Sequence, residues 1–310
     1  MIRRRSYLRL VAAAALVVGI VSCDSVRPEE TGSLAVEAYM NTGLRPGPVI
    51  LRTTQPLDAE GDLFDGSSAT GGGVDLVING VTVEYEEGSP GHYSPPDEYT
   101  DALETGDLFD VHVRWDGRTA RASGILPPPI RIDSISVVAP GEPVEAILID
   151  SLRLDSLGVD ATTGYIYPIE TTAWWTQDPA SGPDSWIQAQ LRPRSQFSSV
   201  VVDFFLLPEQ VFAEDDAGSG EFAPMSWTGL YAIPVDRADQ SLPSHELRIA
   251  VVRSSKVYAD YATTQFNSDG REPPSNVEGA LGIVVGLSVD SVVVQVDPLA
   301  AKQQTFAINR

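Results

Sequence analysis

The chain has 310 residues, and its 21 Lys and Arg stand against 43 Asp and Glu, which gives a formal net charge of −22 at pH 7. This balance argues against nucleic-acid binding, since phosphate contacts need clusters of Lys and Arg, and against electrostatic docking on anionic headgroups. The hydrophobic content of 43% is that of a globular chain. The charge fits two alternatives: attraction of cations or basic partners, and a merely solvated acidic surface.

The N-terminus has the layout of a bacterial lipoprotein signal peptide. Three arginines at 3–5 precede an apolar run over 10–21, and the run ends next to Cys23, the only cysteine. Small residues before such a cysteine allow cleavage, and the thiol then carries the lipid. The run is shorter than the roughly 20 residues that a membrane span needs. We therefore expect a signal peptide over 1–22 and attachment to the membrane by lipid on Cys23; the alternative is a buried core cysteine.

A polar stretch over 23–32 is expected to be a flexible tether. After it, residues 33–125 are predicted to form an Ig-like β-sandwich domain, because short alternating segments are separated by turn signals about every ten residues. Asn79-Gly80 and Asp116-Gly117 are expected hairpin turns, since a type I′ turn needs positive φ at both positions. The expected strands are 34–39, 48–52, 74–78, 81–85, 108–115 and 118–123.

Three consecutive prolines, 127–129, cannot join a β-ladder, so we place a domain boundary there. Residues 130–310 are predicted to form a second β-rich domain with one helix near 254–266, in which Val257, Tyr258 and Tyr261 fall near one face. The predicted fold class is therefore mainly all-β, with two β-sandwich-like domains and a single helix in the second. The expected strands here are 131–138, 145–150, 164–175, 186–191, 199–207, 247–252 and 282–296.

The sequence contains no pattern typical of a catalytic site. Only three histidines are present, at positions 92, 112 and 245, and no Gly-x-Ser-x-Gly motif accompanies them. Zinc is disfavoured because the mature chain has no free thiolate and no close histidine pair. The chain is therefore expected to be non-enzymatic and to need no cofactor.

A structural calcium ion is the one metal that the sequence leaves open. Asp58, Glu60 and Asp62, followed by Asp65, place carboxylates at alternate positions of a short loop, and oxygen ligands suit calcium. The loop departs from the EF-hand pattern because Ala69 occupies the position of the closing glutamate. Glu214 to Asp216 forms a second acidic loop. For both, the alternative is a solvated loop without metal.

Aromatic residues of the second half are candidates for binding a ligand or a partner. Trp174 and Trp175 are adjacent on an expected strand, so they must face opposite sides of it. One is expected to enter the core and the other to point outward or to an inter-domain contact. Asn276 and Glu278 lie in a loop after two prolines, which is either a rim that contacts a ligand or only the turn before the last strands.

Several motifs, in order along the mature chain, resemble the lipoproteins of domain-of-unknown-function family 4249 (DUF4249). The most specific is Pro274-Ser-Asn-Val-Glu-Gly-Ala-Leu-Gly282, which follows the tyrosine-bearing helix and precedes Ser288-Val-Asp290. The chain departs from the family at Ala280, where a second glycine is expected, and at 284–285, where an aromatic residue is usual. The other matching segments are 34–39, 47–54, 74–80, 91–93, 117–122 and 127–135.

The resemblance implies a cellular location and a kind of partner protein, but no chemical reaction. Members are lipoproteins whose genes often lie beside those of TonB-dependent outer-membrane receptors. We therefore expect a lipid-anchored outer-membrane protein, facing the periplasm or the cell surface, that acts as an accessory to such a transporter. The alternative function is a carbohydrate- or peptide-binding adhesion module that uses the aromatic residues of the second domain.

Overall fold

The computed structural model describes residues 32–54, 67–149, 161–176, 185–194, 209–217, 225–264, 274–298 and 303–308. The predicted lipidation site Cys23, the signal peptide and the candidate calcium ligands Asp58, Glu60 and Asp62 lie outside these ranges. The predicted strand over 199–207 does too. The described part is mainly β-structure with one α-helix, as the sequence predicts.

The first half forms a β-sandwich whose strands alternate between buried and exposed side chains. The two hairpins expected from Asn-Gly and Asp-Gly are present: Asn79 and Asp116 have φ of 48°, and the glycines that follow have φ of 87° and 72°. Two-residue loops of this kind match the twist of the strands that they join. The strands are β1 (Leu34–Asn41), β2 (Val49–Thr53), β3 (Ser67–Ser68), β4 (Gly73–Ile78), β5 (Val81–Ser89), β6 (His92–Ser94), β7 (Leu108–Trp115) and β8 (Arg118–Ile125).

The second half forms another sandwich, in which one sheet has the order β10-β11-β9-β17 with β14 on the other side of β11. It packs against β12, β15 and the second part of β16 around a separate hydrophobic core. The sequence did not indicate β13, β14 or β17. The strands are β9 (Ile132–Val138), β10 (Val144–Ile149), β11 (Ala161–Trp175), β12 (Ser185–Arg194), β13 (Glu209–Ala213), β14 (Met225–Val235), β15 (His245–Ser255), β16 (Leu281–Val296) and β17 (Gln304–Ala307).

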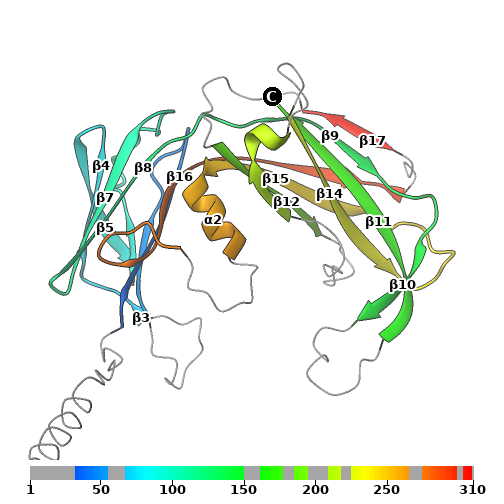
Figure 1. Cartoon of the computed structure of the whole chain (residues 1–310), viewed down its shortest axis with the longest axis horizontal. Helices are drawn as coiled ribbons and strands as arrows, with labels where there is room; N and C mark the ends of the chain where they lie inside the picture. Colours follow the sequence, from blue (N-terminus) through cyan, green and yellow to red (C-terminus); the bar gives the residue numbers. More distant parts are fainter. Residues whose placement is uncertain are drawn as a thin grey trace, which may run out of the picture.

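The long strand β16 belongs to both sandwiches (Figure 1). Its first part, 281–287, pairs in parallel with β1, and its second part, 287–296, pairs antiparallel with β15. The core of the first sandwich accordingly includes Val277 and Val284, which come from outside the predicted range 33–125. Because β16 continues from one sandwich into the other, a single twelve-stranded sheet runs through both of them.

The helix α2 (Lys256–Thr264) follows β15 directly and lies between the two sandwiches in Figure 1. Its buried residues are Ala259 and Ala262, while Tyr258 and Tyr261 pack against a third apolar cluster on β15 and β16. Val257, expected on the same stripe, is 39% exposed. A nine-residue helix needs such tertiary packing, because isolated helices of this length are unstable. No helix in the described ranges is long and apolar enough to cross a membrane.

Gly282 tests the parallel pairing of β1 with β16. Its φ is +118°, and a Cβ atom there would lie 2.0 Å from the backbone oxygen of Val36. We expect Gly282→Ala to lower the free energy of unfolding by at least about 2 kcal/mol, because both the backbone conformation and the close approach are lost. Gly141 has open space around it, so Gly141→Ala is the control. Equal denaturation midpoints for the two variants would contradict the pairing.

Candidate functional site

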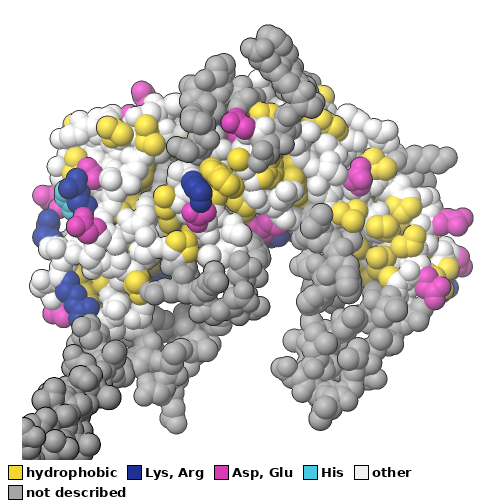
Figure 2. Space-filling model, in the orientation of Figure 1, with side chains coloured by type: hydrophobic (Ala, Val, Ile, Leu, Met, Phe, Trp, Pro, Cys, Tyr) yellow, Lys and Arg dark blue, Asp and Glu magenta, His cyan; other side chains and the backbone are white. Residues whose placement is uncertain are grey.

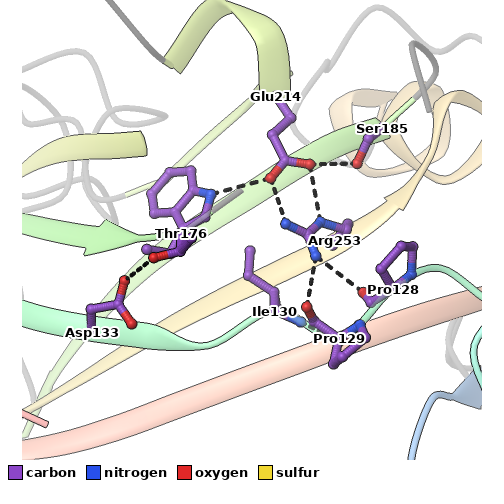
Figure 3. A network of polar contacts seen from close by, with 10 residues as sticks. Pro128, Pro129, Ile130, Asp133, Thr176, Ser185, Glu214 and Arg253 are labelled. Atoms are coloured by element: carbon purple, nitrogen blue, oxygen red, sulfur yellow. Dashed lines mark hydrogen bonds and ion pairs between the residues drawn. The ribbon is translucent and has the colours of Figure 1, made fainter. Parts of the chain in front are cut away.

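A buried ion pair lies where the two sandwiches meet (Figure 3). The Arg253 side chain at the end of β15 and Glu214, in the 3-10 turn Glu214–Ala217, are both fully buried. Two hydrogen bonds join them, of 3.0 Å from Nε to Oε2 and 2.5 Å from Nη2 to Oε1. A bidentate pair of this kind satisfies both charges in a region where neither can be solvated.

The same pair attaches the proline linker to the second sandwich. Arg253 Nη1 donates to the carbonyl oxygens of Pro128 and Pro129, at 3.1 and 2.7 Å. Glu214 also accepts hydrogen bonds from the indole of Trp175, at 3.3 Å, and from Ser185, at 2.6 Å. Prolines outside a ladder leave their carbonyl groups free for side-chain donors. The linker is therefore held by side chains.

Two further contacts bind the linker to β16. The backbone N–H groups of Ile130 and Ile132 donate to Ser288 Oγ and Asp290 Oδ2, at 2.9 and 2.8 Å. Both acceptor side chains are buried. Together with Arg253, these contacts and the continuous β16 fix the junction of the two sandwiches, so the surfaces on either side of it are held in one arrangement.

An apolar hollow of about 250 Å³ opens beside α2 on the outer face of the shared sheet. The outward positions of β1, β2 and β16 form its floor, and Tyr261 and Pro274 stand at its side. Ala35 pairs with Arg52 on one side and Leu281 on the other, so a small side chain lies between two large ones. This difference in size leaves space on the sheet.

Polar groups mark the margin of the hollow. Glu37 accepts a hydrogen bond of 2.9 Å from the Tyr39 hydroxyl, and burial together with the nearby Glu37 raises the pKa of Tyr39. Arg52 is exposed and has no ion pair among the described residues. Tyr258 packs edge-to-face on Tyr39 with 6.2 Å between ring centroids, and burial raises its pKa to about 12. The hollow therefore has a mainly apolar floor, with the Glu37 carboxylate and the Arg52 guanidinium among its lining residues.

A second, shallower hollow of about 510 Å³ lies on β7 and β8. Its lining includes His112, whose Nε2 atom is buried without a hydrogen-bond partner in the described part of the chain. Ion pairs lie on both sides of it: Arg114 with Asp75 at 2.6 Å and Arg121 with Asp110 at 3.0 Å. Each arginine is more than half exposed, so these pairs contribute little to stability.

Asn276 and Glu278 do not share one site. The Asn276 side chain bonds the backbone of Val284 twice, with its Nδ2 donating at 2.7 Å and its Oδ1 accepting at 2.9 Å. Glu278 forms a backbone bridge with Arg121, and its exposed side chain lines the hollow on β7 and β8. Asn276 thus holds the loop against β16. This is the arrangement expected of a turn before the last strands, in which the amide side chain is used for structure.

Trp174 and Trp175 face opposite sides of β11, as expected. Trp175 is fully buried, and its indole bonds Glu214, so a ligand cannot reach the ring in this structure. Trp174 lies on the outer face of the sheet and is partly exposed. Of the pair, Trp174 is the one placed where it could contact a ligand.

His245 has the surroundings of a structural residue. Its Nδ1 lies 2.9 Å from the Pro243 carbonyl oxygen, which can only accept, so Nδ1 carries the proton and Nε2 accepts from the Tyr231 hydroxyl at 2.7 Å. The residue is 1% exposed. Burial lowers the pKa of His245 below its ordinary value of 6.5. Both ring nitrogens are thus bonded to Tyr231 and Pro243, and no carboxylate among the described residues is bonded to the ring.

The metal candidates gain no support within the described residues. Glu214, expected in an acidic loop, accepts hydrogen bonds from Arg253, Trp175 and Ser185 through its carboxylate. In the described ranges no three His, Cys, Asp or Glu side chains come together as a metal-binding group.

Sequence reasoning missed the ion pair of Arg253 with Glu214. The available signal was an arginine that directly follows the apolar run Ile249 to Val252 in an expected core strand. A charge in such a place needs a buried partner, but the sequence does not say which of 43 acidic residues supplies it.

Removing one member of the buried pair should strongly destabilise the protein. We expect Arg253→Met to lower the free energy of unfolding by about 3–5 kcal/mol, because the carboxylate of Glu214 stays buried without its partner. Combining it with Glu214→Leu should recover part of this loss. The control is Arg121→Met at an exposed pair, with an expected cost below about 1 kcal/mol. Denaturant titration measures the free energy of unfolding of all these variants. Similar losses for Arg253→Met and Arg121→Met would contradict the role of the buried pair.

The buried His245 should make stability fall in mild acid. Its folded pKa lies below the unfolded value of about 6.5, so protonation favours the unfolded state as the pH drops below 6.5. Relative to His245→Gln, the native chain should lose up to about 1.4 kcal/mol per pH unit between pH 6.5 and the lowered pKa. Denaturant titrations at pH 7.5, 6 and 5 give the two slopes, and parallel slopes would show that the ring titrates normally.

Comparison of the sequence and the structure with protein-family models, curated proteins and solved structures returned no match. The resemblance to the DUF4249 lipoproteins therefore stays a prediction from the quoted motifs.

Proposed function

We propose that this protein is a non-enzymatic, lipid-anchored lipoprotein of the outer membrane that acts as an accessory to a TonB-dependent transporter. It works by contacting a partner or capturing a ligand. The predicted lipid on Cys23 supplies the anchor, and residues 23–32 supply the tether. Whether it faces the periplasm or the surface depends on the export route.

The observation that carries this proposal is the apolar hollow beside α2. Its walls come from elements far apart in sequence, including β1, α2 and the segment before β16, and the shared strand and the buried ion pair hold them together. A concave apolar site with a few polar groups at its edge is the usual form of a binding site. Rigid walls lower the entropic cost of binding, because little has to be ordered on contact.

The polar groups nearest to the hollow support binding over chemistry. Glu37 is bonded to Tyr39, and the amide of Asn276 is bonded to the backbone of Val284. These contacts give the side chains structural tasks. Because Arg52 and Glu37, of opposite charge, both line the otherwise apolar hollow, it suits an apolar group that bears a hydrogen-bonding end.

Filling the hollow tests the proposal. Ala35→Phe adds a ring on its floor, and Ala250→Phe makes the same change at a partly exposed position on β15. When the lipidated protein is purified from its own membranes in mild detergent, a TonB-dependent receptor should accompany the native chain and Ala250→Phe. We expect Ala35→Phe to retain at least about tenfold less receptor, a change of 1.4 kcal/mol in binding. Repeated purifications without any such receptor would overturn the proposal.

A carbohydrate- or peptide-binding adhesion module is the second candidate, because Trp174 lies partly exposed on a sheet face. An exposed indole ring can stack on a sugar. Glycan-array binding that is lost in Trp174→Ala, with an unchanged melting temperature, would favour this function over the first.

A further inference from the structure

The outer face of the sheet formed by β9, β10, β11 and β14 is unusually apolar. Tyr167 and Ile169 of β11 point into the core, so the alternate residues Ile166, Pro168 and Glu170 point outward. Cross-strand neighbours extend this surface in both directions, and two of them, Val138 and Val144, are 38% and 44% exposed. We call these six apolar residues the β11 face: Val138, Val144, Ile166, Pro168, Leu230 and Pro234.

The β11 face is visible in Figure 2 as a group of hydrophobic side chains over β11 and β14, with acidic side chains at its margin. The outer face of β7 and β8 gives a contrast within the same molecule. There the outward positions carry Asp110, His112, Arg114 and Arg121, with ion pairs among neighbouring strands. A solvent-facing antiparallel sheet normally has polar outward residues. On the β11 face two of the six apolar residues are exposed and four are partly exposed, and an apolar patch of this kind marks a surface that another molecule can cover.

The charges around the β11 face are mainly negative, and Arg237, which follows Asp236, is exposed and paired with Asp239 at 3.3 Å. The strands β9, β10, β11, β14 and β17 contain no Lys or Arg. Glu170 lies within the face, since it pairs with Val138 and Leu230, and it is exposed. Exposed Glu142 and Asp236 lie close in the chain to Val144 and Pro234.

This charge pattern indicates which kind of molecule could bind to the β11 face. Two copies of the chain would bring like charges together, which opposes self-association through this face. Anionic lipid headgroups are repelled for the same reason. A protein surface with an apolar centre and Lys or Arg at its margin is complementary in both respects.

We propose that the β11 face is the docking surface for a partner protein whose contact patch is apolar with a basic margin. The inference rests on the proposed accessory function and adds to it the surface that meets the partner. The β11 face and the hollow beside α2 are built from different strands, so variants of one leave the other intact.

Site-specific photo-crosslinking in the producing cells tests this surface. The photoreactive residue p-benzoylphenylalanine replaces Val138 in the full lipidated chain, and replaces Val293 in the control. Val293 is also an exposed valine on a strand, but on the outer face of the other sheet. We expect at least about tenfold more protein adduct from position 138 than from position 293, because only position 138 lies in the β11 face. The crosslinked peptide of the partner should contain apolar residues beside Lys or Arg.

A charge reversal tests the basic margin. Glu170→Lys should lower the yield of the adduct at position 138 about tenfold, because it places a cation against the cations of the partner. Glu246→Lys makes the same change of charge at an exposed position of β15 and should leave the yield unchanged. Equal melting temperatures of the two variants show that the fold is intact.

Three results would overturn the inference: equal yields at positions 138 and 293, an adduct only with lipid or a second copy of the chain, or equal yields for the two charge variants. The proposed accessory function and the β11 face can be tested independently of each other. A receptor that co-purifies while position 138 gives no adduct would leave the accessory function standing without this surface. A partner with a basic margin that is no transporter would leave the surface standing without that function.

Discussion

The pairing of β1 with β16 is the constraint on which the rest of the structure depends. A strand near the end of the chain lies in parallel beside the first strand, and its continuation pairs with β15 in the other sandwich. The hollow beside α2, the core contact of Val284 and the anchoring of the linker at Ser288 all follow from this path. Parallel neighbours need a long connection, and here that connection is almost the whole protein.

The buried pair of Arg253 and Glu214 complements this shared strand. The strand joins the sandwiches along one line, and the pair joins them through the linker at a second place. Two attachments restrict rotation where one would leave a hinge. A buried ion pair adds little net stability over apolar packing, but its geometry defines one arrangement of the groups around it. Its function in this molecule is therefore to fix the orientation of the two halves.

Local patterns predicted much of the fold because they depend on neighbouring residues. The Asn79-Gly80 hairpin, the alternation within β7 and the helix near 254–266 all follow from short-range chemistry, and each is present with bounds within a few residues. The burial of Trp175 opposite Trp174 follows from the period of a strand. On α2 the pattern predicted a stripe that included Val257, whereas packing instead selected the small residues Ala259 and Ala262.

Long-range pairing could not be predicted in this way. No local signal in Leu281 to Leu287 distinguishes a partner in the first half from one in the second, since both offer apolar strands. The linker prolines indicated a boundary, but not that their carbonyls accept hydrogen bonds from Arg253. The hollow depends on Ala35 lying between Arg52 and Leu281, which is a matter of register across strands. The candidate site was therefore less predictable than the elements that build it.

The order in which the sandwiches can be completed follows from β16. A chain is synthesised from its N-terminus, so the strands of the first sandwich exist long before Leu281, their last neighbour, is available. Until then β1 presents an open edge, and such edges attract other strands. Pairing over so large a separation in sequence is slow, because the closure entropy is paid before the contact forms. The first sandwich, although it comes first in the chain, is thus the last to be completed, and β1 keeps an open edge until β16 has been made.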